Sequence, residues 1–250
     1  MNPGFRRRLS GPAPLIGTIV TLDSPAAAER LALAGFDWLF IDGEHAPLGP
    51  AGIQALLQAI GGRCPAVVRV PVIDETWIKK ALDAGADGVI VPQVRGPEDA
   101  RKVVSWSRYP PQGERGVGVA RAQGYGASFD AYLGRANDDL AVILQIEHPD
   151  AVSRVAEIAA VDGVDALFVG PYDLSTSMGT PGQVGAAPVV EAIGNVARAC
   201  REAGIAPGIF GMTADDLRPW LERGFTLVAV GIDVVWLGRA AEAALESLRN

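Results

Sequence analysis

The sequence predicts a (β/α)8 barrel of the TIM type, an α/β fold, and three observations lead to this prediction. The chain has 250 residues, a length at which α/β barrels commonly form one domain. Short, almost continuous apolar segments recur along it, as expected for parallel strands that are buried on both faces. Helical patterns separate these segments and no Ser/Gly-rich linker interrupts them, so we expect residues 1–250 to form a single barrel domain.

A weak repeat marks the turns at which a helix is followed by a strand. It occurs at Ala34–Ile41, Ala84–Val91, Asp162–Val169 and Arg223–Val230, and each copy places a glycine just before an apolar run. Glycine ends helices readily because it adopts the left-handed conformation without strain. The repeat therefore predicts four helix-then-strand units.

Filling the gaps between these units gives eight strands in all. We expect them near residues 15–21, 38–42, 66–70, 88–92, 141–146, 165–169, 205–209 and 226–230. The helices between them are expected at 26–34, 50–61, 76–84, 97–107, 151–159 and 189–203. An open, doubly wound sheet is the main alternative, but that fold usually has fewer strands.

One connection is unusually long, the stretch from residue 108 to residue 140. We expect it to contain a helix near 128–138 and to form a lid at the mouth of the barrel or a contact between subunits. Its glycines, between Arg115 and Gly124, are too irregularly spaced for a phosphate-binding loop.

Composition limits the partners of the chain. A net charge of −7 argues against nucleic acid, and no apolar run reaches the length of a membrane span. The basic start at residues 1–10 has no apolar segment behind it, so a signal peptide is not expected. Cys64 and Cys200 lack metal or redox spacing, which is typical of a cytoplasmic protein with buried thiols. We therefore expect a small molecule as the substrate.

Chemistry in a TIM barrel takes place at the carboxyl ends of the strands. Polar side chains cluster at these positions of the sequence. They are Asp42, Glu44 and His45 after the second strand, Arg69 at the third, Gln93 after the fourth, Gln145, Glu147 and His148 at the fifth, and Asp173 after the sixth.

Glu147 and Asp173 are the most informative of these residues. Two carboxylates that meet at one point repel each other unless a cation, a shared proton or a positive substrate lies between them. Oxygen ligands suit a hard divalent ion, so we expect Mg²⁺, Mn²⁺ or Co²⁺ as the cofactor. Gln145 lies on the same strand face as Glu147 and is placed to orient a ligand.

The other polar residues each have a structural alternative. We favour a functional role for His45 and a structural one for His148, which should point away from Glu147. Arg69 needs an anionic partner, and we favour a substrate over a structural carboxylate. Glu44 is expected to be a surface or ion-pairing residue. Asp42 fits a loop cap and a catalytic acid equally well, and both readings stay open.

The three lysines of the chain give a useful exclusion. Lys79, Lys80 and Lys102 all fall within expected helices. A Schiff-base mechanism needs a lysine inside the site. We therefore expect carbonyl chemistry here to depend on a metal, and the chain has no dinucleotide-binding fingerprint or P-loop either.

Five segments of the chain together resemble a known family. Asp42–His45, Arg69–Pro71, Lys80–Val94, Gln145–Glu147 and Gly170–Gly179 resemble the 4-hydroxy-2-oxoheptanedioate aldolases. These are class II pyruvate aldolases of the aldolase/citrate lyase family, and the likeness runs from about residue 15 to residue 245. It implies a metal-dependent lyase of aromatic catabolism that reversibly cleaves a 4-hydroxy-2-oxo acid to pyruvate and an aldehyde.

The resemblance also implies how pyruvate is held. Glu147 and Asp173 would hold the divalent metal, which binds the carboxylate and the 2-oxo group of pyruvate. Arg69 would stabilise the pyruvate enolate. The backbone that receives the pyruvate carboxylate would be that of Gly170, Pro171 and Tyr172.

The same resemblance implies the acid–base residues and the assembly. His45 would be the general base, supported by Asp42 and Asp83. Asp83 is expected on a helix away from its own barrel mouth, so a neighbouring subunit could supply it. Relatives are typically hexamers, trimers of dimers, with a swapped C-terminal helix, which here is the pattern Val234–Leu248.

The sequence leaves the acceptor aldehyde and three other functions open. Tyr172 departs from the small residue or Asn that is common in relatives, so it could alter acceptor choice. A lyase for coenzyme A thioesters would need a basic groove, which the sequence does not suggest. A non-catalytic barrel that binds a 2-oxo acid is a second alternative. A phosphate site formed by Gly208, Gly211 and Gly231 is the third.

Overall fold

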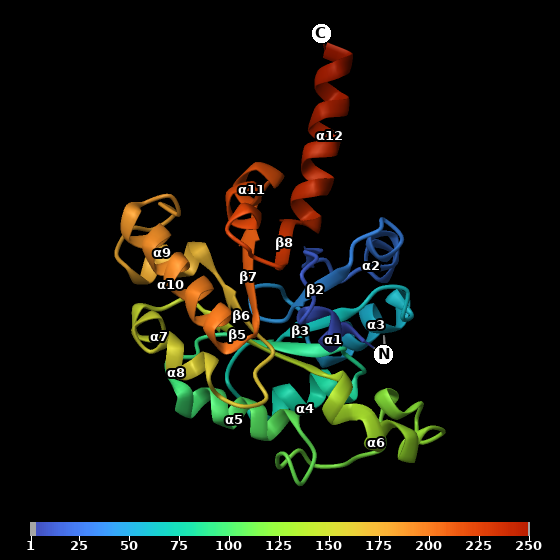
Figure 1. The fold of residues 1–250 in the computed structure, drawn as a ribbon. Helices are drawn as coiled ribbons and strands as arrows, with labels where there is room; N and C mark the ends of the chain where they lie inside the picture. Colours follow the sequence, from blue (N-terminus) through green and yellow to red (C-terminus); the bar gives the residue numbers. More distant parts are fainter. Residues whose placement is uncertain (1–3, 250) are drawn as a thin grey trace.

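The computed structural model describes residues 4–249, in which eight parallel strands close into a barrel (Figure 1). The strands pair in chain order, and β8 pairs with β1. Their bounds are β1 Leu15–Val20, β2 Trp38–Asp42, β3 Ala66–Arg69, β4 Gly88–Val91, β5 Ala141–Ile146, β6 Ala166–Val169, β7 Ala206–Gly211 and β8 Leu227–Ile232. The predicted barrel is confirmed, and the closed strand order excludes the open sheet.

Helices surround this barrel. They are α1 Phe5–Leu9, α2 Pro25–Ala32, α3 Pro50–Ile60, α4 Glu75–Asp83, α5 Pro97–Ser107, the short 3-10 helix η1 Arg121–Gln123, α6 Phe129–Asp139, α7 Pro149–Ser153, α8 Val155–Ala159, α9 Pro171–Ser177, α10 Ala187–Ala203, α11 Ala214–Glu222 and α12 Asp233–Arg249. The single helix expected at 151–159 is in fact two, α7 and α8, because Arg154 leaves helical geometry at φ −116° and ψ 15°.

Aromatic side chains fill the inside of the barrel. Trp38 packs edge-on against Phe168, and its indole Nε1 lies 3.2 Å from the carbonyl oxygens of Leu15 and Val228. Gly17 permits this position, because a Cβ there would lie 2.6 Å from the indole ring. A second apolar layer lies between the strands and the surrounding helices.

Helix α1 had no counterpart among the expected elements, although it falls on the basic start of the chain. Its side chains Phe5 and Leu9 are buried, and the Phe5 ring lies 6.2 Å from that of Trp38. It therefore adds to the core at the amino ends of the strands. Residues 1–3 of the basic start lie outside the described part of the chain.

The connection 108–140 lies at the end of the barrel opposite to the one we expected. It joins the end of α5 to the start of β5, which places it at the amino ends of the strands. Arg121 confirms this position, since its guanidinium donates to the carbonyls of Leu57 and Ala84, near the ends of α3 and α4. A lid over the mouth formed by this segment of the same chain is therefore wrong.

Helix α12 leaves the carboxyl end of β8 and projects away from the barrel (Figure 1). Within the chain it contacts mainly β1 and β8. Trp236, Leu237 and Leu248 are among its exposed apolar residues. Of the helices in residues 4–249, none has the length and apolar character needed to cross a membrane.

Candidate active site

Arg69 and Asp42 are paired at the carboxyl ends of β3 and β2. Their Cα atoms are register partners, and the guanidinium Nε and Nη2 donate to the two carboxylate oxygens at 2.9 and 2.7 Å. Both side chains are almost completely buried, at 9% and 4% exposure. This two-point geometry fixes the plane of the guanidinium at the mouth of the barrel.

The environment of Asp42 favours its charged form. Burial alone would raise the pKa of its carboxyl, but the hydrogen bonds and charge of Arg69 outweigh burial, helped by the backbone N–H groups of Glu44 and His45. The net result is a pKa below the usual value. Asp42 thus caps the loop after β2, as one of the two readings expected, and it also anchors Arg69. Its role as a catalytic acid stays a prediction.

Two further polar side chains complete the surroundings of Arg69. Its Nη1 lies 3.1 Å from the Glu44 carboxylate and donates to the Gln145 side-chain oxygen at 3.3 Å. Glu44 is largely buried, and burial raises the pKa of its carboxyl. Its expected pairing role is confirmed, although it lies at the site and not on the surface.

Glu147 and Asp173 converge beside Gly170. A Cβ built on Gly170 would lie 3.4 Å from Glu147 Oε2, 3.6 Å from Asp173 Oδ2 and 3.3 Å from Gln145 Nε2. The side-chain amide of Gln145 also donates to Glu147 Oε2. The glycine leaves open the space beside both carboxylates and the amide.

Burial raises the pKa of Glu147, and the negative charge of Asp173 raises it further. Hydrogen bonds from the Gln145 amide and from the Gln93 backbone N–H, which donates at 2.6 Å, oppose this rise without cancelling it. A carboxylate of this kind is stabilised when a cation comes close to it.

Helix α9 brings Asp173 to this point. The helix starts at Pro171, separated from the end of β6 by Gly170 alone, and Asp173 lies in its first turn. Tyr172 is the residue before it, is about 39% exposed, and packs its ring 6.1 Å from that of Phe210. Because this strand-to-helix turn is so short, Asp173 still faces the barrel mouth although it lies four positions after the end of β6.

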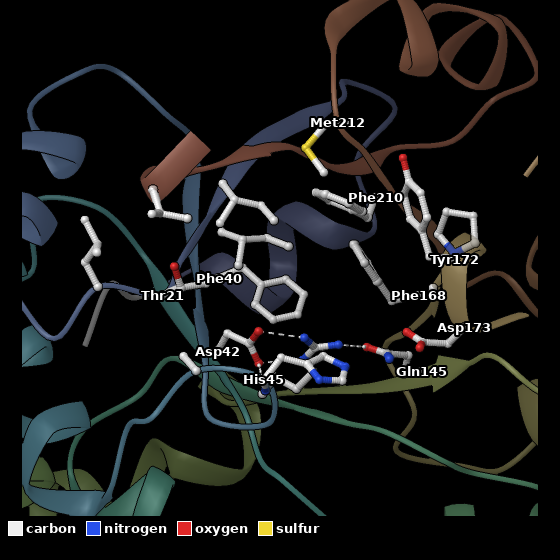
Figure 2. A pocket seen from close by; sticks show the side chains of 18 of the residues that line it. Thr21, Phe40, Asp42, His45, Gln145, Phe168, Tyr172, Asp173, Phe210 and Met212 are labelled. Atoms are coloured by element: carbon white, nitrogen blue, oxygen red, sulfur yellow. Dashed lines mark hydrogen bonds and ion pairs between the residues drawn. The ribbon is translucent and has the colours of Figure 1, made fainter. Parts of the chain in front are cut away.

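A cavity of about 660 Å³ opens at this mouth, a volume typical of small-molecule sites (Figure 2). Asp42, Arg69, Gln145 and Asp173 line one side of it. A smaller cavity of about 270 Å³ adjoins it and is lined by Glu147. The two cavities share two lining residues, His45 and Asp173.

The two histidines have different surroundings, and the functional role expected for His45 stays a prediction. The imidazole of His45 is 62% exposed and lies between the two cavities, 3.9 Å from Glu44. His148 instead caps α7, because its Nδ1 accepts from the backbone N–H of Asp150. Its imidazole also contacts Arg95. His148 therefore has the structural role that we favoured, although it borders the smaller cavity.

Asp83 is the one site candidate that lies away from the others in this chain. It ends α4, at the amino end of the barrel, and pairs with the buried Arg115 at 2.6 Å. This placement agrees with the expectation that it cannot reach its own barrel mouth. The lysines also lie where expected, Lys79 and Lys80 in α4 and Lys102 in α5.

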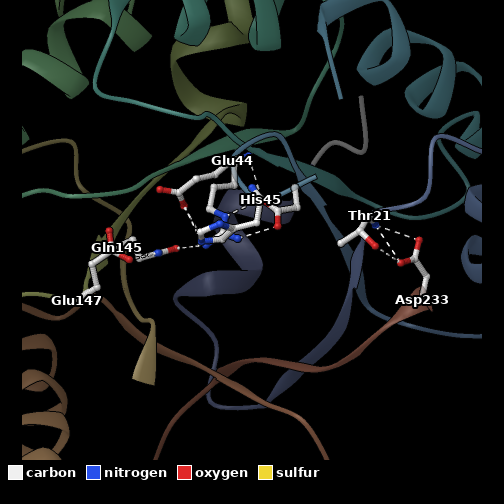
Figure 3. Close-up of polar contacts among 8 residues, drawn as sticks. Thr21, Glu44, His45, Gln145, Glu147 and Asp233 are labelled. Carbon is white, nitrogen blue, oxygen red and sulfur yellow. Dashed lines mark hydrogen bonds and ion pairs between the residues drawn. The ribbon is translucent and has the colours of Figure 1, made fainter. Parts of the chain in front are cut away.

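The structure adds two residues to which the sequence gave no role, Gln93 and Asp233, and Figure 3 shows Asp233 beside Thr21. Gln93 has a left-handed backbone, φ 58°, which turns its N–H toward Glu147. Asp233, at the start of α12, is buried and accepts hydrogen bonds from the N–H groups of Thr21 and Leu22. Asp233 could have been recognised in the sequence as an acid directly after the eighth strand. It was missed because that strand was expected to end at residue 230, whereas β8 ends at Ile232.

The glycines considered for a phosphate site have packing roles instead. Gly208 and Gly211 lie within β7 and Gly231 lies within β8. A Cβ would lie 2.5 Å from Phe168 at Gly208, 2.7 Å from Leu217 at Gly211, and 2.4 Å from Trp236 at Gly231. Their positions do not favour the phosphate reading.

Comparison with known proteins places this site in a family. The sequence profile of the HpcH/HpaI aldolase/citrate lyase family matches residues 16–240. A hydroxypyruvate/pyruvate aldolase of Deinococcus radiodurans is 45% identical over 249 residues, which cover 98% of this chain and 90% of the relative. A 4-hydroxy-2-oxo-heptane-1,7-dioate aldolase of Klebsiella pneumoniae is 44% identical over 246 residues, covering 97% and 92%.

Solved structures agree with this relationship. The crystal structure of an HpcH/HpaI aldolase/citrate lyase family protein from Burkholderia cenocepacia superposes with a TM-score of 0.95, at 42% identity and with both chains fully covered. Fold and sequence thus agree over the whole length that carries the site. The chain therefore belongs to the HpcH/HpaI aldolase/citrate lyase family, and it is an enzyme of the carbon–carbon lyase class.

Proposed function

We propose that this enzyme is a class II aldolase that reversibly cleaves a 4-hydroxy-2-oxo acid into pyruvate and an aldehyde, with the help of a divalent metal. The observation that carries the proposal is the convergence of Glu147 and Asp173 beside Gln145, next to the anchored guanidinium of Arg69. The names of the relatives, aldolases that align with 98% and 97% of this chain, support it.

The residues present fit a hard divalent cation. Glu147 and Asp173 offer oxygen atoms around the space that Gly170 leaves open. Burial, and to a smaller extent Asp173, raise the pKa of Glu147, so a cation beside it would stabilise its charged form. Residues 4–249 contain no ready cluster of three or more His, Cys, Asp or Glu ligands. An ion such as Mg²⁺, which keeps waters and takes ligands from its substrate, needs only one or two protein carboxylates. Mn²⁺ and Co²⁺ are the other ions that we propose.

When bound, the cation would supply Lewis-acid polarisation of the 2-oxo group. Arg69 supplies a fixed positive charge close by. Of its five N–H donors, three are used by Asp42 and Gln145, and Nη1 also lies 3.1 Å from the Glu44 carboxylate. The remaining donor capacity would serve a developing enolate. Because Asp42 fixes the guanidinium, little reorganisation is needed as the negative charge grows. The backbone at Gly170–Tyr172 would receive the pyruvate carboxylate at the start of α9.

His45 is the group that we propose for moving the proton. In the cleavage direction its imidazole takes the proton of the 4-hydroxyl group, the C3–C4 bond breaks, and the carbonyl of the aldehyde forms. The electron pair of the broken bond becomes the enolate of pyruvate, and a proton then returns to C3. An imidazole can accept a proton and later donate it, so the same group serves in both directions.

Exchange of the pyruvate methyl protons with deuterium tests this proposal without an acceptor. We expect exchange by NMR with Mg²⁺, Mn²⁺ or Co²⁺, and a loss of at least 100-fold after chelation or in the Glu147→Ala variant. Exchange that survives both would contradict the proposal. Tight pyruvate binding without exchange would instead indicate a non-catalytic barrel, and thermal protection by coenzyme A would indicate a thioester lyase.

We further propose that the enzyme is a homo-oligomer, a hexamer built as a trimer of dimers, in which α12 packs on a neighbouring subunit. The support is the projecting helix with its exposed apolar residues, such as Leu237 at 63% and Leu248 at 85% exposure. Asp83 would then reach the site of a neighbour. Light scattering of the wild type and of a Leu237→Glu variant tests this assembly, since the variant should dissociate.

We place the enzyme in the cytoplasm. Both cysteines, Cys64 and Cys200, are buried free thiols, as is usual in a reducing compartment. Fractionation of the producing cells tests this placement.

A further inference from the structure

The large cavity has two chemically different sides (Figure 2). The polar groups lie together on the side formed by β2, β3, β5 and the start of α9. The other side, contributed largely by β1, β7 and β8, is mainly apolar, and its polar residues are Thr21 and Asp23 just after β1. Its wall, here called the apolar wall, consists of Ile19, Phe168, Phe210, Met212 and Ile232. Phe40 also lines the cavity, but its ring lies on the polar side, 5.1 Å from the Arg69 guanidinium.

The proposed function assigns the cation of the polar side, Arg69, to the pyruvate enolate. Arg69 is the only Lys or Arg side chain among the described residues that line this cavity, and it is held by Asp42, Glu44 and Gln145. The acids of the cavity, in contrast, number three: Asp23, Asp42 and Asp173. A second anionic group on a ligand would find the apolar wall on one side and carboxylates on the other.

We propose that the acceptor aldehyde carries an apolar alkyl or aryl chain and no carboxylate, and that this chain lies against the apolar wall. The inference rests on the proposed function, because it concerns the aldehyde half of the same reaction. Moving a carboxylate from water to an apolar surface without a counter-ion is strongly unfavourable, whereas burying an alkyl or aryl chain is favourable. The polar side is then left to pyruvate and the cation.

Arg95 is the nearest alternative partner for a second carboxylate, and its position argues against that role. It lines the smaller cavity with Glu147, not the large one. Its guanidinium is about half exposed and lies 3.4 Å from the Asp150 carboxylate. A chain directed toward Arg95 would pass Glu147, whose negative charge repels a carboxylate.

The proposal can be tested with two substrates that differ at one group. They are 4-hydroxy-2-oxoheptanedioate, whose far end is a carboxylate, and 4-hydroxy-7-methyl-2-oxooctanoate, in which an isopropyl group of similar shape replaces it. Pyruvate release from each is measured at several metal concentrations. We expect kcat/KM to be at least tenfold higher for the isopropyl substrate. An equal or higher value for the diacid would overturn the proposal.

A charge placed on the apolar wall gives a second test. Met212→Arg adds a cation to the wall, and Met212→Gln is the matched control that adds polarity at similar length without charge. We expect the arginine variant to shift the ratio of kcat/KM toward the diacid at least fivefold relative to the glutamine variant. The same ratio in both variants would contradict the assignment of the wall to the acceptor.

Methyl exchange of pyruvate, measured on the wild type and on each variant, distinguishes failure of the proposed aldolase function from failure of the acceptor assignment. If neither substrate is cleaved and exchange is absent as well, the proposed aldolase function fails. If exchange occurs while the isopropyl substrate is not cleaved, the function stands and the inference about the acceptor is overturned.

Discussion

Arg69 is held by Asp42 through two hydrogen bonds, of 2.9 and 2.7 Å, between residues that are direct register partners on β3 and β2. The pair forms because both strands end at the same layer of the barrel. It turns an arginine that would otherwise be a buried, mobile charge into a fixed group facing the cavity. Stability and function therefore depend on the same contact.

Removing the charge of Asp42 should destabilise the protein. In Asp42→Asn, Arg69 keeps only Glu44 as an ionic partner, and breaking a buried ion pair in this way costs about 3 kcal/mol. Chemical denaturation measures the change in the free energy of unfolding. Glu75→Gln is the control, because it breaks an exposed pair with Lys79 and should change stability by about 0.5 kcal/mol or less. Equal effects of the two variants would contradict the buried pairing.

The same pair sets a dependence on pH. Asp42 has a folded-state pKa below its ordinary value of 3.8, so near that pH the unfolded chain binds more protons than the folded one. The stabilisation is complete above pH 3.8 and is lost as the pH falls through the lowered pKa. The difference in unfolding free energy between wild type and Asp42→Asn should therefore be constant from pH 7 to pH 5 and shrink below pH 3.8. A difference that grows in acid would show the opposite sign.

A methyl group at Gly170 should impair metal binding without unfolding the protein. Its Cβ would enter the space beside Glu147, Asp173 and Gln145, and the backbone there, at φ −93°, accepts alanine. We expect at least tenfold weaker Mn²⁺ binding by calorimetry. Gly194→Ala is the control: it lies within α10 with no atom near the added Cβ, and should leave metal binding as it is while raising stability by about 0.5–1 kcal/mol. Unchanged Mn²⁺ affinity in Gly170→Ala would argue against the proposed metal position.

Tyr172 should limit the length of the acceptor. Its ring packs on Phe210, and both residues line the large cavity and also a neighbouring cavity of about 260 Å³. In Tyr172→Ala the two spaces should join, so kcat/KM for a long acceptor should rise about tenfold relative to a short one. Pyruvate-coupled assays over a series of chain lengths measure this ratio. Tyr172→Phe, which keeps the ring, should retain the preference of the wild type, and an identical shift in both variants would contradict a steric role.

Much of the fold follows from local patterns. The start and end of most strands were predicted to within about two residues, because runs of apolar residues bounded by glycine reflect burial on both faces. The break at Arg154 and helix α1 were not predicted. Helix α1 depends on packing against a distant element, the Phe5 ring against Trp38.

The end of the barrel at which the long connection lies was predicted wrongly, for a different reason. Its length indicates that it has a special role. The end of the barrel at which it lies, however, depends on whether it follows a strand or a helix. Residues 108–140 follow α5, so they lie at the amino ends of the strands. The prediction of a lid failed because it used the length of the connection and did not consider that the connection follows a helix.

The sequence by itself determined the barrel, the absence of a lysine from the strand ends, and the acids and cations gathered there. These follow from periodicity and from the shared direction of parallel strands. Only the tertiary structure decided what each side chain contacts. It paired Arg69 with Asp42, turned the Gln93 N–H toward Glu147, and set Asp83 against Arg115 at the far end. Such contacts join residues that are distant in the chain, and side-chain distances across a closed barrel have no signature in local sequence.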